Sequence, residues 1–235
     1  MTCLTAVYEC AQLQVGRWPY NVRINFTRPG QVKLNWCSGA LIHPQLVLTA
    51  GHCTFFKNPG MPASQKYSPR DLTMRIGGYN ISLSPYDDAD DEGVSTEFVD
   101  GSRGDIVQLM AHPQYNPDSG KLGEYDVGLV QLKKPACHTP VQINTGNAGS
   151  AAANQAASAR PSKQGTSGIP GPLILQGASP DQDTLLGTVS FGPPQCNKRP
   201  PRLYSAYVNV AYPAIQSWIQ TQLDKLGPVS TEDCY

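Results

Sequence analysis

Residues 37–53 read CSGALIHPQLVLTAGHC, and this stretch decides the expected fold. Two short apolar runs, 40–42 and 46–50, flank a His-Pro-Gln turn. Apolar runs of this length around a turn that contains proline are typical of paired β-strands. The second run leads directly into His52 and Cys53. The stretch therefore predicts a strand pair that leads into His52 and Cys53.

The rest of the chain continues this alternation of short strands and turns. Further strand patterns cover residues 18–24, 32–36, 72–76, 94–99, 106–110, 127–132, 172–175, 185–191 and 203–210. Apolar residues at helical spacing occupy 214–226, where Gly and Pro close the pattern. Strands joined by turns, with no helix between them, predict an all-β barrel or sandwich.

The bulk composition excludes some classes of partner. Among 235 residues, Lys and Arg number 18 and Asp and Glu number 18, so the formal net charge is zero. This balance gives no reason to expect nucleic acid or an anionic membrane as a partner. No apolar run approaches the roughly eighteen residues that a membrane helix needs. We therefore expect no nucleic acid and no membrane among the partners.

Cysteines and glycosylation triplets point to an oxidising compartment. The seven cysteines lack paired Cys-X-X-Cys spacing, so disulfides are expected and a metal site is not. Asn25 and Asn80 each begin an Asn-X-Ser/Thr triplet and are the predicted glycosylation sites. The acidic residues within 87–92 are interpreted as a solvated loop, with a calcium site as the alternative. We expect an extracellular protein, although residues 1–10 show no signal-peptide pattern.

Residues 37–53 closely resemble the histidine segment of chymotrypsin- and trypsin-like serine proteases, in which a strand runs into Thr-Ala-Ala-His-Cys. A second segment of that family resembles residues 111–132, which contain AHPQYN and then YDVGLVQL. The resemblance implies that His52 is the general base and that Asp126 orients it. It also implies a disulfide between Cys37 and Cys53. His43 and His112 fall in turns and are predicted to be structural.

The family's serine segment is matched less closely. Residues 164–173 read QGTSGIPGPL, which resembles Gln-Gly-Asp-Ser-Gly-Gly-Pro-Leu with two extra residues. This alignment implies Ser167 as the nucleophile, with the backbone N–H groups of Gly165 and Ser167 holding the oxyanion. A rival alignment without the insertion places Ile169 at the nucleophile position and implies an inert chain. In a third interpretation, Ser167 is an ordinary serine of a Gly/Ser-rich linker. We prefer the first, because four of the five residues from 164 to 168 match.

Other parts of the serine-side half depart from the family. Thr166 stands where the family has an aspartate that receives a freed N-terminal amine, and no basic cleavage site precedes Gly16. Several strands that the family places before its serine segment have no counterpart here. Downstream, Ser190, Phe191 and Gly192 resemble the family's Ser-Trp-Gly, whose backbone pairs with substrate.

The resemblance therefore implies a chymotrypsin-like double β-barrel with an incomplete second barrel and a C-terminal helix. We expect an N-terminal barrel over 1–143, a flexible small-residue linker over 144–163 and a partial C-terminal barrel with the helix over 164–235. The implied activity is that of a serine endopeptidase that cleaves protein or peptide substrates through an acyl-enzyme, without a cofactor. A protein inhibitor is a further expected partner. The alternatives are a silent homologue that binds a protein, and a truncated gene model.

Overall fold

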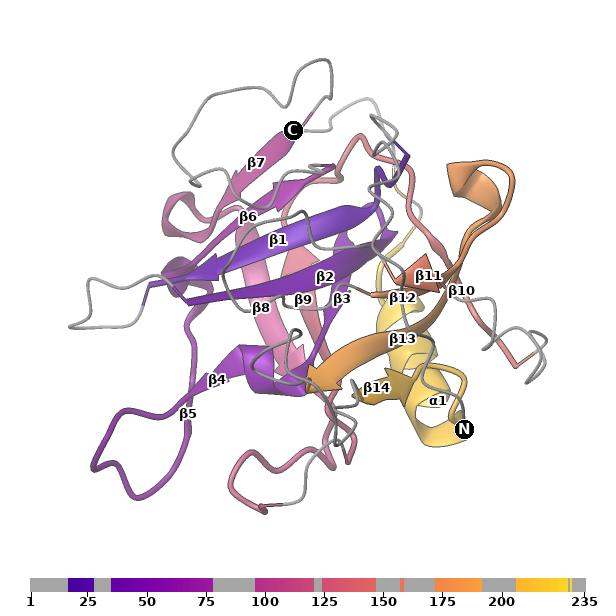
Figure 1. Ribbon diagram of the computed structural model, residues 1–235. Coiled ribbons are helices and arrows are strands. Elements are labelled where there is room, and N and C mark those ends of the chain that lie inside the picture. The colour runs from indigo at the N-terminus through magenta and orange to yellow at the C-terminus, as the bar shows by residue number, and fades with distance from the viewer. Residues whose placement is uncertain are drawn as a thin grey trace, which may run out of the picture.

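The computed structural model describes two large β-sheets, a small two-stranded sheet and one α-helix, and buried residues from all of them form a single core (Figure 1). The described residues are 17–27, 35–77, 96–120, 124–146, 157–158, 172–191, 206–227 and 229. Within them the architecture is all-β with a C-terminal helix, as the sequence predicts. The predicted residues Gly165, Ser167, Gly192, Asn80 and the acidic stretch 87–92 lie outside this part of the chain.

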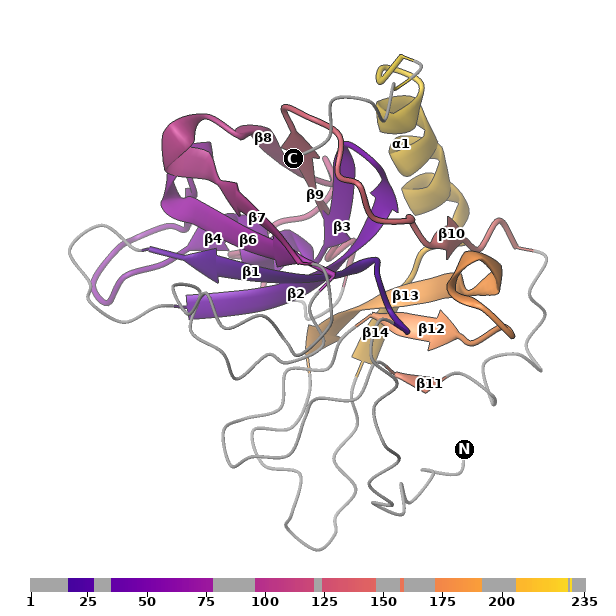
Figure 2. The same cartoon turned by 90° about the horizontal axis from the view of Figure 1, so that it is seen from above.

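The first sheet has seven antiparallel strands and curls into a half-barrel (Figures 1 and 2). Their order is β7-β6-β1-β2-β3-β9-β8. Their bounds are β1 (Asn21–Phe26), β2 (Asn35–His43), β3 (Leu46–Thr49), β6 (Leu72–Ile76), β7 (Glu97–Asp100), β8 (Ile106–Ala111) and β9 (Gly128–Leu132). Residue 39 must be glycine, because a Cβ there would lie 2.7 Å from the Leu48 carbonyl oxygen across the β2–β3 pair.

The second sheet has five strands, in the order β10-β13-β12-β11, with β14 also paired to β13. Their bounds are β10 (Gln142–Ile143), β11 (Ala157–Ser158), β12 (Leu173–Leu175), β13 (Thr184–Phe191) and β14 (Ala206–Asn209). The short β10 runs parallel to β13, and the other pairs are antiparallel. The last residues of the expected N-terminal unit thus pair with the second sheet. β11 falls within the stretch that the sequence analysis assigned to a linker.

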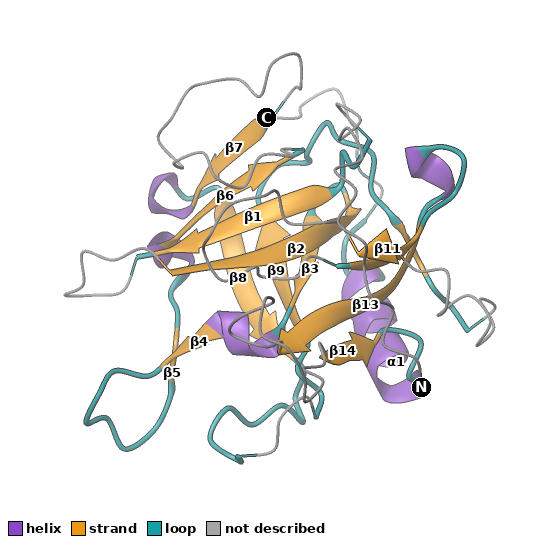
Figure 3. Cartoon of the chain, viewed as in Figure 1, coloured by secondary structure: helices purple, strands orange, loops and turns teal. Residues whose placement is uncertain are grey.

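Short elements connect the strands and close the chain (Figure 3). The two-stranded pair β4 (Phe55–Phe56) and β5 (Gln65–Lys66) is hydrogen-bonded to neither of the larger sheets, although Phe56 is buried in the common core. Helix α1 (Pro213–Leu223) buries Ile215 and Ile219 against the core, which explains its helical spacing of apolar residues. Among the described residues, no helix is long and apolar enough to cross a lipid bilayer.

Two His-Pro-Gln turns, at residues 43–45 and 112–114, each contain the same kind of local hydrogen bond. In each turn the glutamine backbone N–H donates to the histidine Nδ1 at 3.2 Å. An imidazole that accepts at Nδ1 is neutral, because the protonated ring carries hydrogen on both nitrogens. Burial lowers the pKa of both His43 and His112. Both side chains therefore have a structural role in these turns, in line with the sequence prediction.

These two histidines predict that acid weakens the fold. Their folded-state pKa is lowered, whereas the unfolded chain titrates near the usual value of about 6.5. The unfolded state thus binds more protons as the pH falls below about 6.5, and the free energy of unfolding decreases. We expect urea denaturation between about pH 5 and pH 7 to show this loss. The plot of the free energy of unfolding against pH should have a shallower slope in His112→Gln than in the wild-type chain. Equal slopes for the two proteins would contradict the neutral, buried state of His112.

Candidate active site

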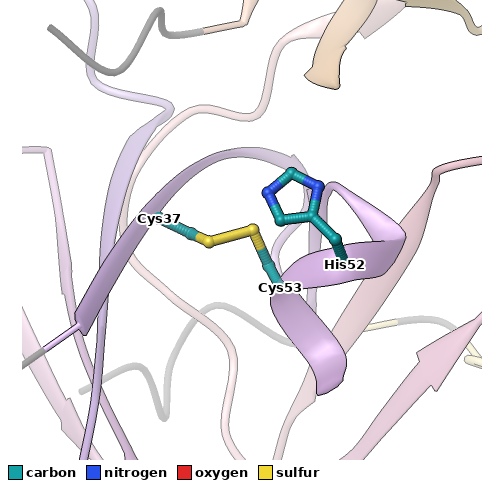
Figure 4. Close-up of side chains that lie close together, drawn as sticks. All are labelled: Cys37, His52 and Cys53. Carbon is teal, nitrogen blue, oxygen red and sulfur yellow. A yellow bond between two sulfur atoms is a disulfide. The ribbon is translucent and has the colours of Figure 1, made fainter. Parts of the chain in front are cut away.

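His52 stands in the short 3-10 helix η1 (Gly51–Thr54), directly after β3. Cys53, the next residue, forms a disulfide with Cys37 on β2, with the two Cα atoms 6.2 Å apart. The predicted Cys37–Cys53 disulfide is confirmed. Figure 4 shows the imidazole of His52 beside this bond. The disulfide therefore ties the turn that carries His52 to the neighbouring strand.

The close grouping of Cys37, His52 and Cys53 resembles a metal-ligand set, since their ligand atoms lie within 4.8 Å of one another. Metal-binding cysteine requires a thiolate. Both sulfur atoms are instead bonded to each other. The three side chains are thus close because of the disulfide, and of the three only the imidazole of His52 could bind a metal ion.

Asp126 holds His52 at two points. Its Oδ2 lies 2.9 Å from His52 Nδ1, and its Oδ1 accepts the His52 backbone N–H at 2.7 Å. The carboxylate is buried, whereas 46% of the His52 side chain is exposed. A hydrogen on Nδ1 that donates to Asp126 leaves the lone pair of Nε2 available. The pair therefore presents an oriented imidazole that is able to accept a proton at Nε2.

Ser190 on β13 completes the surroundings of this carboxylate. Its Oγ donates to Asp126 Oδ2 at 2.5 Å, and its side chain is buried. The family resemblance implies a backbone role for Ser190 in substrate binding and does not reveal this side-chain contact. No local pattern signals it, because 64 residues separate the two positions. The second sheet thus contributes a hydrogen-bond donor to a carboxylate that lies just before β9 of the first sheet.

The backbone that presents Asp126 is strained. Tyr125 has a φ of 51°, a left-handed conformation that is unusual for an aromatic residue. Its carbonyl accepts the Val127 N–H at 2.7 Å, which makes a tight turn centred on Asp126. The Tyr125 ring stacks on His112 with centroids 4.8 Å apart and meets Tyr212 edge-on. Such strain persists only where surrounding contacts enforce it, and it is commonly found at functional sites.

Gly51 leaves room for the carboxylate and for a neighbouring phenol. A Cβ at this position would lie 3.0 Å from the Tyr115 ring and 3.1 Å from Asp126 Oδ1. Burial, reinforced by the negative charge of Asp126, raises the pKa of Tyr115, which therefore stays neutral at physiological pH. The wall next to Asp126 is consequently aromatic and uncharged.

The structure brings some of the predicted site residues together. His52, Asp126 and Ser190 converge, and Phe191 ends β13 one residue further on. Asn25 is only 2% exposed, and its side-chain oxygen accepts from Arg23 Nε at 3.1 Å. This burial argues against a glycan at Asn25, because the amide nitrogen that would carry the sugar is enclosed by the fold.

Comparison with known proteins agrees with this arrangement. The Trypsin family model matches residues 8–161. Melanization protease 1 of Drosophila melanogaster is 30% identical over 120 residues, covering 49% of this chain and 27% of the relative. Chymotrypsin-like elastase family member 3A of Homo sapiens is 29% identical over 119 residues, covering 51% and 35%. Glucanase inhibitor protein 2 of Phytophthora sojae is 27% identical over 128 residues, covering 54% and 34%.

The matches cover different shares of this chain and of its relatives. The chain covers no more than 35% of the length of these three relatives. The family match includes His52 and Asp126 and ends at residue 161, before Ser167. It nevertheless spans more than half of the 235 residues. The chain therefore belongs to the trypsin family of serine proteases and has their all-β, chymotrypsin-like fold.

Proposed function

We propose that the chain is a serine endopeptidase with His52 as general base, Asp126 as its orienting partner and Ser167 as nucleophile. The observation that carries the proposal is the buried Asp126 carboxylate, which binds both Nδ1 and the backbone N–H of His52. This contact fixes the tautomer that a base needs and stabilises the imidazolium that forms during the reaction. The family membership supports the same chemistry.

In the proposed reaction, Ser167 Oγ attacks the carbonyl carbon of a peptide bond and gives its proton to His52 Nε2. The backbone N–H groups of Gly165 and Ser167 would hold the oxyanion. The imidazolium then protonates the leaving amine, and an acyl-enzyme remains. Water attacks this ester, His52 takes the water's proton, and the carboxylic acid product is released as Ser167 regains its hydrogen.

Substrate would lie along the end of β13. We assign the backbone of Ser190, Phe191 and Gly192 to substrate binding, and a protein or peptide as the substrate. A protein inhibitor that occupies the same site is a further proposed partner. The Cys37–Cys53 disulfide supports an extracellular location, because such bonds persist mainly in oxidising compartments. Asn80 remains the predicted glycosylation site.

A fluorophosphonate probe, which reacts with activated serine hydroxyls, tests this assignment. We expect the wild-type chain to be labelled, and both Ser167→Ala and His52→Ala to lose the label. Ser102→Ala is the matched control, because Ser102 is an exposed serine on η3 (Gly101–Arg103) and should not affect labelling. Labelling that survives Ser167→Ala would refute Ser167 as the nucleophile.

A second candidate function is a silent homologue that binds a protein. Glucanase inhibitor protein 2, one of the similar relatives, is named as an inhibitor. The family match also ends before the serine segment, in which Thr166 and Ile169 depart from the family pattern. A chain that unfolds cooperatively but takes no probe would support this function. A broad, uncooperative thermal transition would instead indicate a truncated gene product.

A further inference from the structure

The carboxylate of Asp183, the residue immediately before β13, is fully buried and receives four hydrogen bonds. Arg17 donates Nη1 to Oδ2 at 2.5 Å and Nη2 to Oδ1 at 2.7 Å. Tyr20 Oη donates to Oδ2 at 2.5 Å, and the Gly177 backbone N–H donates to Oδ1 at 2.7 Å. Arg17 Nη2 also donates to the Gly177 carbonyl at 3.0 Å. Both oxygens of Asp183 are thus saturated.

This cluster joins two distant parts of the chain. Arg17 and Tyr20 precede β1 in the first sheet, whereas Asp183 immediately precedes β13 in the second. A sequence separation of 166 residues lies between Arg17 and Asp183. Arg17 and Tyr20 donate to the Asp183 carboxylate from the segment that leads into β1. The cluster therefore links the beginning of β13 to the beginning of β1.

Stability alone does not explain a buried ion pair of this kind. Removing two charges from water costs free energy, and apolar replacements of a whole buried ionic cluster are often equally or more stable. Directional hydrogen bonds instead define a geometry. The planar guanidinium of Arg17 can donate two parallel bonds to a carboxylate in only one relative orientation. The cluster is therefore better suited to setting position than to adding stability.

β13 needs such a reference point because its pairing is irregular near Ser190. In the β13–β14 pair, Val189 faces Tyr207 and Phe191 faces Ala206, so the register shifts around Ser190. The β12–β13 pair contains a second shift, at Leu173 and Ile174. A displacement of one residue along a strand turns every side chain to the opposite face. The strand pairing alone therefore does not guarantee that the Ser190 hydroxyl points at Asp126.

We propose that Arg17, Tyr20 and Asp183 form a register lock that positions Ser190 against Asp126 and, through Asp126, the imidazole of His52. Ser190 lies seven residues after Asp183, about 23 Å along the strand. The members of the lock are positioning residues, because they act on His52 only through β13 and Ser190. The inference rests on the proposed function in one respect: His52 and Asp126 are taken to be the working pair.

NMR on the full-length chain with ¹⁵N-labelled histidine tests the lock. The chain has only four histidines, so the Nδ1 resonance of His52 is assignable with His52→Ala as a reference. This resonance reports on the proton at Nδ1 and its bond to Asp126. The lock is removed as a unit in Arg17→Met/Tyr20→Phe/Asp183→Leu, a variant chosen to keep the site packed without a stranded charge.

We expect the lock-free variant to shift the His52 Nδ1 resonance in the same direction and by the same amount as Ser190→Ala. Combining the two changes should add nothing, because both break one chain of contacts. Ile76→Val is the matched control, a change in the buried core of β6 that should weaken the fold slightly and leave the resonance in place. An unchanged resonance in the lock-free variant, or additive shifts in the combination, would overturn the proposal.

Two milder variants keep the test decisive if the lock-free variant does not fold. Tyr20→Phe removes one of the four bonds, and Arg17→Lys keeps the charge but loses the two-pronged contact. Each should produce part of the Ser190→Ala shift, and no shift in either would count against the lock. If the proposed function holds, probe labelling should slow about tenfold in the lock-free variant. If the wild-type chain takes no probe but the lock-free variant still shifts the His52 Nδ1 resonance, the lock is retained and the protease function is rejected.

Discussion

Asp126→Asn should slow fluorophosphonate labelling, and any peptide hydrolysis, by roughly 10⁴-fold. The amide matches the carboxylate in shape but offers an N–H₂ group where His52 Nδ1 now faces an acceptor. His52 would then carry its hydrogen on Nε2, which leaves no lone pair to take the proton of Ser167. The labelling rate constant, measured under pseudo-first-order conditions, checks this expectation.

The control for this substitution is Asp118→Asn. Asp118 is another aspartate whose charge, like that of Asp126, raises the pKa of Tyr115. Its own pKa is held at about 2 by hydrogen bonds from Lys57 Nζ and from the backbone N–H of Ser64. It contacts neither His52 nor Asp126 through any of these bonds, so labelling should stay near the wild-type rate. The orienting role of Asp126 is wrong if Asp126→Asn and Asp118→Asn react at the same rate.

The strands that the sequence predicts well are those in which burial alternates along a single run. Leu72–Ile76 is observed with the predicted bounds, because its three apolar residues all face the core and Ser68 caps the turn just before it. The first predicted strand, over 18–24, is displaced to Asn21–Phe26. There the Asn21 N–H donates to the Trp18 carbonyl at 3.0 Å, so a turn occupies the start of the predicted run. Alternating apolar and polar residues indicate which side chains are buried, but they do not show where a preceding turn ends and the strand begins.

The features of the candidate site also differ in how local their sequence determinants are. His52 and its disulfide are predictable because the stretch that resembles the family's histidine segment is continuous and contains both cysteines within seventeen residues. The Ser190–Asp126 and Arg17–Asp183 contacts leave no local trace, since each joins side chains that only the tertiary fold brings together. The nucleophile assignment to Ser167 stays a prediction from sequence. The contacts that link the two sheets are therefore those that local patterns cannot supply.

Arg17→Met should lower the free energy of unfolding by about 3–5 kcal/mol, because it leaves the buried charge of Asp183 without its cation. Asp183 is 0% exposed, so water does not replace the two guanidinium bonds. Urea denaturation at neutral pH, monitored by tryptophan fluorescence, measures the loss. A midpoint that moves without a change in slope would show that native stability, and not the compactness of the unfolded chain, has changed.

Arg103→Met provides the matched comparison, since it also removes an arginine from an aspartate. The Arg103 Nε lies 3.4 Å from Asp100 Oδ2, but 77% of the Arg103 side chain is exposed. Water solvates both groups when such a surface pair is broken, so the expected loss is below about 1 kcal/mol. Adding Tyr20→Phe and Asp183→Leu to Arg17→Met should recover most of the stability, because no charge then remains buried. If Arg17→Met is no more destabilising than Arg103→Met, the Asp183 carboxylate is not enclosed as described, and its bonds from Arg17 and Tyr20 do not hold the two sheets together.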